Sequence, residues 1–502
     1  LKRIGRAVSS PMAIPILAVL SLLASCARIS GSPYTLVADA GSTGTRVYLF
    51  HVEDTSGETK LDISDLGKGP PLSSFQDNPD DAAATVRKQV EKARGLIPRS
   101  LHSAVPVLIF ATAGMRLVQA QKARAVYEGL RVGVLDGDFP FDRKAYQART
   151  ISGREEGVYA FLAANYLAQR IGLDLKVRNQ NLMGVLDLGG SSTQIAVPPK
   201  VREGSPIAAS LGEAHMYVRS FLSLGMERMR QLTFQTLFQE AHWALRGGAR
   251  VPNPCAFDGY IESGELWRGT GDAAQCQKVV ATVLRREATL CRGSEPRSLR
   301  RSSCLPMGLV RPAMDAASAA VPRFFLISGF VFVADFTRWW LEHPGVLPKP
   351  SEDLLADERE ILSALGNATA FTSPTIAELK AAVAVLCASP WSNVSNSAAN
   401  PSTRHRYSPI SKVPHRCFEL NYIITLLSHG YGFPEGSRPF QFVDAIAGRE
   451  VEWTLGAFLI SRSAPDAPIH LAADGSSILP PLVFERPWVA VPALLTLGLV
   501  VQ

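Results

Sequence analysis

The stretch Asp39-Ala40-Gly41-Ser42-Thr43-Gly44-Thr45-Arg46 decides how the rest of the chain is interpreted. It lies between two short apolar runs, and this pattern predicts a strand, a glycine-rich turn and a second strand. The same arrangement returns 148 residues later (187 − 39) as Asp187-Leu188-Gly189-Gly190-Ser191-Ser192-Thr193-Gln194, again between apolar runs. The two stretches form the main internal repeat of the sequence.

Both copies combine residue types that suit phosphate binding. Glycines let backbone N–H groups approach a phosphate closely, and Ser and Thr hydroxyls add donors. One such turn also ends ordinary hairpins, but two facing turns can hold a phosphate chain from opposite sides. Asp39 and Asp187 would then hold a hydrated divalent cation between them, because Mg²⁺ and Ca²⁺ favour oxygen ligands. No G-x-x-x-x-G-K-[ST] pattern occurs, which excludes a P-loop.

Length and composition predict a two-lobed globular protein. The chain has 502 residues, more than one hydrophobic core usually supports. A strand pattern at residues 105–111 and a helical pattern at residues 155–168 separate the two repeats, and this alternation indicates α/β lobes. The net charge is +7, but Lys and Arg are evenly spread and the basic stretch at 285–301 lacks aromatic residues. This pattern argues against nucleic-acid binding.

Both ends of the chain are apolar. A basic flank precedes the apolar run at residues 12–27, which is typical of a signal peptide. A signal-anchor remains an alternative because the run approaches the length of a spanning helix; residues 23–26 also fit a lipoprotein signal. The run at 488–501 predicts a truncated membrane anchor, a removed lipid-anchor signal or a disordered tail.

Cysteines and sequons indicate an oxidising compartment. Removal of Cys26 with a signal leaves six of the seven cysteines, and none lies in a C-x-x-C pair, so disulfides are favoured over a zinc site. Glycosylation acceptors occur at Asn367 and Asn393. We therefore expect a protein of the secretory pathway, at the cell surface, outside the cell or in the Golgi or ER lumen, held at a membrane by a terminal apolar segment.

Five motifs in order along the chain resemble those of the apyrases, or nucleoside triphosphate diphosphohydrolases. They occupy residues 39–46, 111–116, 153–157 with 165–167, 187–194 and 453–457. The resemblance spans residues 34 to 460 and implies two RNase-H-like lobes, as in actin, Hsp70 and sugar kinases, with the active site in the cleft between them. The expected organisation is a signal peptide or signal-anchor at 1–30, lobe I at 31–166 with a return segment near 444–462, lobe II at 167–443, a linker at 463–487 and the apolar tail at 488–502.

The resemblance implies how substrate and metal are held. The phosphate-binding residues would be Ser42, Thr43, Gly44, Thr45, Thr112, Ala113, Gly189, Gly190 and Ser191. Asp39 and Asp187 would hold Ca²⁺ or Mg²⁺ through water. Trp453 would lie near the water shell of the metal, although a tryptophan in this position also suits a hydrophobic core.

The resemblance also implies the catalytic residues. Glu156 matches the general base, and Ser192 and Gln194 help to place the attacking water. Glu155 is the neighbouring carboxylate, but on a helix it would point about 100° away from Glu156. Arg116 suits an ion pair that fixes a loop better than a contact with substrate.

The family's crossed disulfide pattern, taken in order along the chain, implies Cys255–Cys291 and Cys276–Cys304, although four cysteines allow three connectivities. The remaining pair, Cys387–Cys417, would close a loop rich in Ser, Asn and Pro.

The implied function is hydrolysis of the terminal phosphates of nucleoside tri- and/or diphosphates by water, with a base and a metal. Two alternatives remain: a Golgi-type diphosphatase that clears GDP or UDP in support of glycosylation, and an actin-like module that binds nucleotide without hydrolysis. The intact motifs around Glu156 and Ser192 argue against the second. Phe325, Phe330 and Tyr422 are candidates for stacking on the base, but core packing is the favoured role for each.

Overall fold

A computed structural model describes residues 32–55, 58–212, 215–241, 250–262, 266–294, 323–343, 346 and 372–463. The predicted signal segment, the apolar tail and almost all of the linker lie outside these residues, as do Asn367 and Cys304. Within the described part of the chain, no helix is both long and apolar enough to cross a membrane.

Each repeat forms a five-stranded sheet. In spatial order, the first contains β3 (Glu58–Gly69), β2 (Gly44–Thr55), β1 (Tyr34–Gly41), β4 (Val107–Ala111) and β5 (Tyr146–Thr150). The second contains β8 (Val218–Leu222), β7 (Ser192–Ala196), β6 (Gly184–Leu188), β11 (Phe324–Ser328) and β12 (Phe440–Phe442).

The two sheets have the same topology. In each, three consecutive strands form an antiparallel meander. One later strand pairs in parallel with the first strand of the meander, and a second later strand pairs in parallel with that one. The internal repeat therefore corresponds to a repeated structural unit, and the predicted fold of two RNase-H-like lobes is confirmed. The predicted strand at 105–111 and helix at 155–168 are confirmed as β4 and α5 (Gly153–Leu167).

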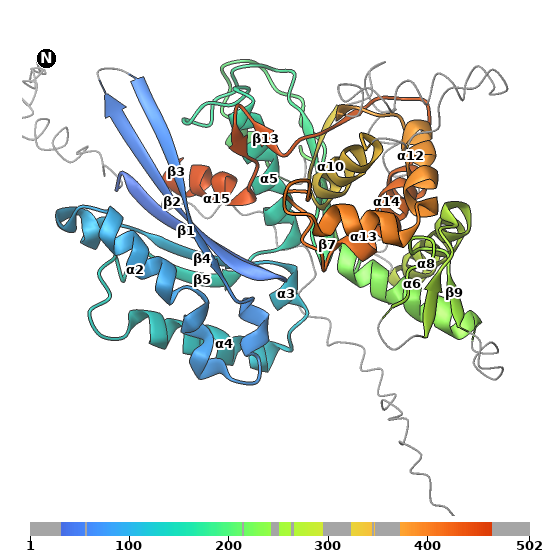
Figure 1. Cartoon of the computed structure of the whole chain (residues 1–502). Helices are drawn as coiled ribbons and strands as arrows, with labels where there is room; N and C mark the ends of the chain where they lie inside the picture. The colour runs from blue at the N-terminus through green and yellow to red at the C-terminus, as the bar shows by residue number, and fades with distance from the viewer. Residues whose placement is uncertain are drawn as a thin grey trace, which may run out of the picture.

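Helices cover the sheets in layers (Figure 1). Lobe I carries α2 (Arg87–Leu96), α3 (Ala113–Arg116) and α4 (Ala120–Leu135), and α5 and α15 (Trp453–Ser463) lie between the sheets. Lobe II carries α6 (Met226–Glu240), α8 (Ala273–Ser294), α10 (Gly329–Leu341), α12 (Ile376–Ala388), α13 (Trp391–Ala399) and α14 (Arg416–Thr425). The small strand pairs are β9 (Val251–Asn253) with β10 (Trp267–Gly269), and β13 (Ala445–Ile446) with β14 (Arg449–Glu450).

The layer between the sheets is a core that both lobes share. Side chains from both sheets, α5 and α15 form one buried cluster, which includes Val37, Val185, Phe161 and Phe458. Helix α5 packs on β6, β7 and β8 of the second sheet, whereas α15 packs on β1 of the first. The expected lobe boundary at residue 166 thus falls within a helix that connects the lobes, and the domain limits stay a prediction.

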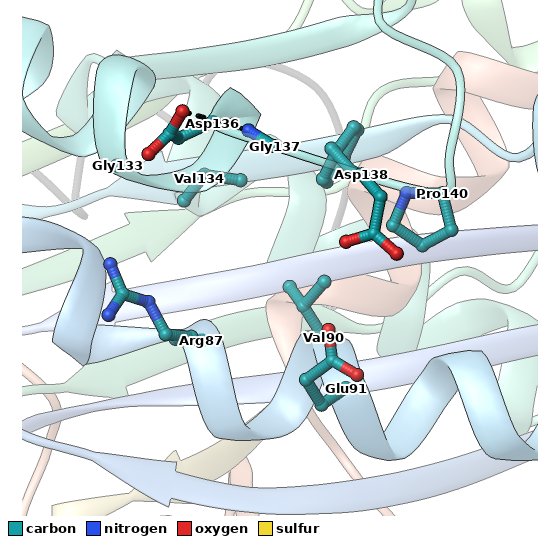
Figure 2. Close-up of a pocket in the computed structure, with 10 residues that line it drawn as sticks. Arg87, Val90, Glu91, Gly133, Val134, Asp136, Gly137, Asp138 and Pro140 are labelled. Atoms are coloured by element: carbon teal, nitrogen blue, oxygen red, sulfur yellow. Dashed lines mark hydrogen bonds between the residues drawn. The ribbon is translucent and has the colours of Figure 1, made fainter.

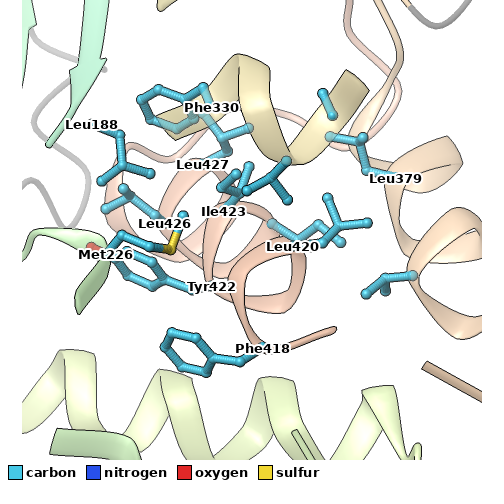
Figure 3. Close-up of a cluster of buried hydrophobic side chains, with 14 of the residues drawn as sticks. Leu188, Met226, Phe330, Leu379, Phe418, Leu420, Tyr422, Ile423, Leu426 and Leu427 are labelled. Carbon is cyan, nitrogen blue, oxygen red and sulfur yellow. The ribbon is translucent and has the colours of Figure 1, made fainter. Parts of the chain in front are cut away.

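Helix α14 lies in the middle of the lobe II core (Figure 3). Every residue from Arg416 to Thr425 is buried, as expected of a helix surrounded by protein on all sides. Phe330 and Tyr422 belong to this core, and Phe325 is 6% exposed in the shared layer. These three aromatics are therefore core residues, so the favoured core-packing interpretation is confirmed and the stacking alternative is excluded.

The disulfides differ in part from expectation. Cys387–Cys417 is confirmed, although the segment that it closes contains α13 rather than only a loop. Cys255 pairs with Cys276, so the predicted Cys255–Cys291 and Cys276–Cys304 bonds are both wrong. The reason is local: the turn after β9 places Cys255 beside the first turn of α8, with 4.9 Å between the Cα atoms of Cys255 and Cys276.

Non-reducing peptide mapping should recover one peptide pair that joins Cys255 to Cys276 and another that joins Cys387 to Cys417. Replacing both Cys387 and Cys417 with Ser should lower the free energy of unfolding by about 2–4 kcal/mol, because the bridge restricts the unfolded chain. Denaturant titration measures this loss. Recovery of a Cys255–Cys291 peptide would show that the crossed pairing is correct.

Candidate active site

The alternation of side chains along two central strands brings Asp39 and Asp187 into the same layer. In β1, Leu36 and Ala38 pack in the outer core of lobe I, whereas Val37 packs in the shared layer. Asp39 is two residues after Val37 and therefore faces the shared layer. By the same rule, Asp187 of β6 faces this layer because Val185 does. The two aspartates thus approach each other from opposite sheets.

The two glycine-rich turns touch where the lobes meet. A Cβ atom at Gly190 would lie only 2.8 Å from the Ser42 hydroxyl oxygen, so the second turn approaches the first closely. The Gly190 carbonyl accepts a hydrogen bond from the Glu227 backbone N–H (3.0 Å), and Met226 extends into the lobe II core beside Leu188 (Figure 3). The second turn is therefore fixed to the start of α6 and to the core beneath it.

The second motif lies against the first turn. Thr112 directly follows β4, and Ala113 begins the short helix α3. A Cβ atom at Gly114 would lie 3.0 Å from the Cα atom of Ser42, so the two backbones approach each other closely there. The structure therefore brings together the three predicted phosphate-binding segments, which are 42–45, 112–113 and 189–191.

Glu156 takes part in a buried polar network with the predicted water-placing residues. The side-chain N–H of Gln194 donates to Glu156 Oε2 (2.9 Å) and to the Ser192 hydroxyl (2.8 Å). Arg116 forms an ion pair with Glu156 Oε2 at 2.5 Å and donates to the Ile151 carbonyl, which confirms the predicted ion pair. Glu156, Ser192 and Gln194, taken from two different motifs, are therefore linked by hydrogen bonds.

Glu155 faces a different set of partners. Its carboxylate accepts from the Ser152 backbone N–H (2.7 Å), while the Ser152 hydroxyl accepts from the Glu155 N–H, which completes a capping box at the start of α5. Arg149 occupies the other carboxylate oxygen at 2.7 Å. Glu155 therefore stabilises the helix that presents Glu156.

The site concentrates negative charge. Burial, followed by repulsion from Glu452, Glu156 and Asp187, raises the pKa of Asp39 well above its usual range, and the charge of Arg46 opposes this shift. Burial and the charge of Glu156 raise the pKa of Asp187 to about 7, although hydrogen bonds from Ser328 and a backbone N–H lower it. Without a counter-charge, ionising both aspartates is unfavourable.

The carboxylate oxygens of Asp39 and Asp187 suit a divalent cation that takes its remaining ligands from water or phosphate. Oδ1 of Asp39 is buried and has no hydrogen-bond partner, so it remains free to accept from a metal-bound water or to ligate a cation. Within the described residues, no group of three or more His, Cys, Asp or Glu side chains is arranged to hold a metal ion. Asp39 and Asp187 would therefore hold Ca²⁺ or Mg²⁺ only together with water or phosphate oxygens.

Sequence reasoning missed two residues near the aspartates. Glu452 precedes α15 and forms an ion pair with Arg46 at 3.4 Å. Ser328 ends β11 and caps the start of α10; its φ of 57° is in the left-handed region, and its side chain donates to Asp187. Glu452 could have been noticed because it directly precedes the fifth motif, whereas nothing in the sequence distinguishes Ser328. Trp453 is 5% exposed and stacks on Tyr159, so it has a core role, and its position near a metal's water shell stays a prediction.

A separate hollow lies on lobe I, away from the aspartates (Figure 2). Its lining comes from α2 and from the C-terminal end of α4 with the turn that follows, and includes Arg87, Glu91 and Asp138. Asp138 is already paired with Arg94 at 2.8 Å. None of the predicted site residues lines this hollow, so it is not the candidate active site.

Two repeated sheets that meet at facing glycine-rich turns make this a two-lobed α/β protein of the actin-like class. The chain belongs to the GDA1/CD39 (nucleoside phosphatase) family, whose model matches residues 28–331 and 361–473.

Named relatives share most of their length with the chain. It is 27% identical to "Probable apyrase 5" of Arabidopsis thaliana, with 88% of this chain and 85% of the relative covered. It is 26% identical to "Ectonucleoside triphosphate diphosphohydrolase 1" of Rattus norvegicus (85% and 80% covered) and 26% identical to "Guanosine-diphosphatase" of Schizosaccharomyces pombe (85% and 73% covered). Among solved structures, a nucleoside triphosphate hydrolase from Neospora caninum has the same fold, with a TM-score of 0.55, 18% identity, and 92% of this chain and 98% of that chain covered.

We expect Asp187→Asn to stabilise the cation-free protein at neutral pH. Because the pKa of Asp187 is raised from its usual value to about 7 in the folded state, folded protein binds more protons than unfolded protein between about pH 4 and 7. The free energy of unfolding should therefore fall as pH rises through this window. Asn at position 187 stays neutral, so the variant should not show the part of this fall that comes from ionisation of Asp187. Thermal unfolding in excess chelator at pH 5, 6, 7 and 8 measures the effect.

The matched control for this prediction is Asp81→Asn, an exposed aspartate of lobe I. It should reproduce the wild-type dependence of stability on pH. A lower melting temperature of Asp187→Asn at pH 8 would show that the Asp187 carboxylate stabilises the fold. Unfavourable ionisation of the two aspartates would then be incorrect.

Proposed function

We propose that the protein hydrolyses the terminal phosphates of nucleoside tri- and/or diphosphates by direct attack of water, with a divalent cation. The observation that carries the proposal is the buried Glu156–Gln194–Ser192 network, which lies in the same layer as the two aspartates. The family and the named relatives support a nucleotide as substrate.

The phosphate chain would lie between the two turns. Backbone N–H groups of Ser42 to Thr45 would bind one part, and those of Gly189 to Ser191 would bind the other, with Thr112 and Ala113 near the terminal phosphate. A cation held by Asp39 and Asp187 would neutralise negative charge on the phosphate oxygens. Such positioning and charge stabilisation supply most of the catalysis in phosphoryl transfer.

The attacking water would be placed and deprotonated by the polar network. Ser192 orients the water through its hydroxyl, and Glu156 accepts its proton. Gln194 holds these two side chains in a fixed relation because its amide donates to both. Arg116 forms an ion pair with Glu156 Oε2 and fixes the position of this carboxylate. Among the described residues, neither Ser42 nor Ser192 has a histidine partner that would activate it as a nucleophile, so attack by water is the simpler route.

We further propose that the protein works in the secretory pathway. The described disulfides suit an oxidising compartment, and the exposed Asn393 of α13 is accessible for glycosylation. Attachment to a membrane would require the terminal apolar segments. The relatives include both an ectonucleotidase and a guanosine-diphosphatase, so either a surface or a Golgi location accords with them.

A phosphate-release panel with ATP, ADP, GDP and UDP, with and without chelator, tests the proposed activity. We expect release that vanishes in chelator and returns with Mg²⁺ or Ca²⁺, and expect Asp39→Ala and Asp187→Ala to abolish it. Release from GDP and UDP alone would identify the Golgi-type diphosphatase. Nucleotide binding without any release would identify the non-hydrolytic module, and full release in chelator would contradict the role of the cation.

Glu156→Gln should lower kcat by about 10²- to 10⁴-fold, the usual contribution of a general base, while nucleotide binding with cation persists. Glu155→Gln is the matched control, because Gln can still accept from the Ser152 N–H in the capping box, and its rate should change little. The reverse result would assign the base to Glu155. Full rates in both variants would exclude a glutamate base at this position.

A further inference from the structure

Lys68 lies over the first glycine-rich turn. It stands near the end of β3 and is paired in register with Arg46 on β2, which directly follows the turn. Gly44, in the turn, has φ of +155°, and a Cβ atom added to it would overlap Cε of Lys68 and lie 3.0 Å from Cδ. The Lys68 side chain therefore fills the space that a side chain at residue 44 would take, and its ammonium group is one bond beyond Cε.

Three cationic side chains, Arg46, Lys68 and Lys412, lie around the first glycine-rich turn. Among them, only Lys68 forms no ion pair within the described residues. Arg46 forms ion pairs with Glu452 and Glu450, and Lys412, which approaches from lobe II, forms one with Glu227. Lys68 makes no salt bridge and no side-chain hydrogen bond in the part of the chain that the structure describes. It is thus available for an anion that is not part of the protein.

The charges around Lys68 favour an added anion. Burial, followed by repulsion from Arg46 and Lys412, lowers the pKa of Lys68, and attraction by Asp39 only partly offsets these effects. A phosphate between the turns would add negative charge close to the ammonium. Lysine is well suited to this contact because its ammonium is a compact point charge with three donors.

We propose that Lys68 is a substrate-contacting residue, whose ammonium binds the phosphate chain held by the turn at Ser42 to Thr45. Gly44 would contribute through its backbone and through the space that it leaves for Lys68. No sequence motif contains Lys68, because the residue reaches the turn from the neighbouring strand. The inference rests on the proposed phosphohydrolase activity and adds a specific side chain to it.

Steady-state kinetics on the full chain, with ADP and ATP at saturating Mg²⁺, test the contact. Lys68→Met should raise KM by roughly 10- to 100-fold, as expected for loss of a charge-assisted hydrogen bond, and Lys68→Arg should restore most of the affinity. Lys60→Met is the control on the same strand, because Lys60 is 63% exposed and pairs only with Asp62. Lys60→Met should leave kcat and KM unchanged.

A double-mutant cycle with Gly44→Ala tests the geometry. The alanine methyl would displace Lys68, so Gly44→Ala should also raise KM. Adding Lys68→Met to Gly44→Ala should raise KM by less than a further threefold. If Lys68→Met raised KM by the same factor in the wild type and in Gly44→Ala, the overlap between residue 44 and Lys68 would have no functional effect. The proposal would then be overturned.

The outcomes separate this inference from the proposed function. A wild-type protein that releases no phosphate from any nucleotide contradicts the proposed function itself. An active wild type with an unchanged KM in a folded Lys68→Met variant contradicts only the contact by Lys68. Melting temperatures of all variants establish that they are folded, and a salt titration of KM that is less steep for Lys68→Met than for wild type supports loss of a phosphate contact.

Discussion

The structure depends on the burial of two carboxylates that face each other from two sheets. Asp39 and Asp187 stand at equivalent places in the two repeats, each in the first strand of a meander and each paired in register with the residue seven positions later. Strand alternation directs both into the layer that the lobes share. Close burial of two acidic groups is costly unless a cation or protons compensate, so their arrangement lowers stability and accords with the proposed cation.

The same shared layer determines where the other polar groups lie. Because α5 packs on the second sheet, Glu156 reaches Gln194 of β7, whose amide also bonds to Ser192, although the chain enters α5 from the first sheet. Arg116, which follows β4 of the first sheet, reaches the same carboxylate. Groups from both lobes therefore contact Glu156. A change in the orientation of one lobe relative to the other would alter the hydrogen bonds of this carboxylate. This coupling gives a physical reason for a site built from motifs that are far apart in sequence.

Repeated local patterns made the fold and much of the candidate site predictable. The two Asp-to-Gly turns predicted the paired hairpins, and helical spacing separated Glu155 from Glu156. The pair Cys387–Cys417 was predicted correctly. The partner of Cys255 was not predictable, because its contact with Cys276 depends on how the turn after β9 meets α8. Lys68 and Ser328 were missed for the same kind of reason: each reaches the site across a sheet or at a strand end, where sequence neighbours carry no signal.

Calorimetric titration of Glu156→Gln with Ca²⁺ tests the central claim most directly, since this variant should bind nucleotide without consuming it. The account predicts weak cation binding to the free protein and much tighter binding in the presence of nucleotide, because two aspartates need phosphate oxygens to complete the ligand set. Replacing Asp39 and Asp187 with Asn should remove this coupling between cation and nucleotide. Equal cation affinity with and without nucleotide would contradict the account.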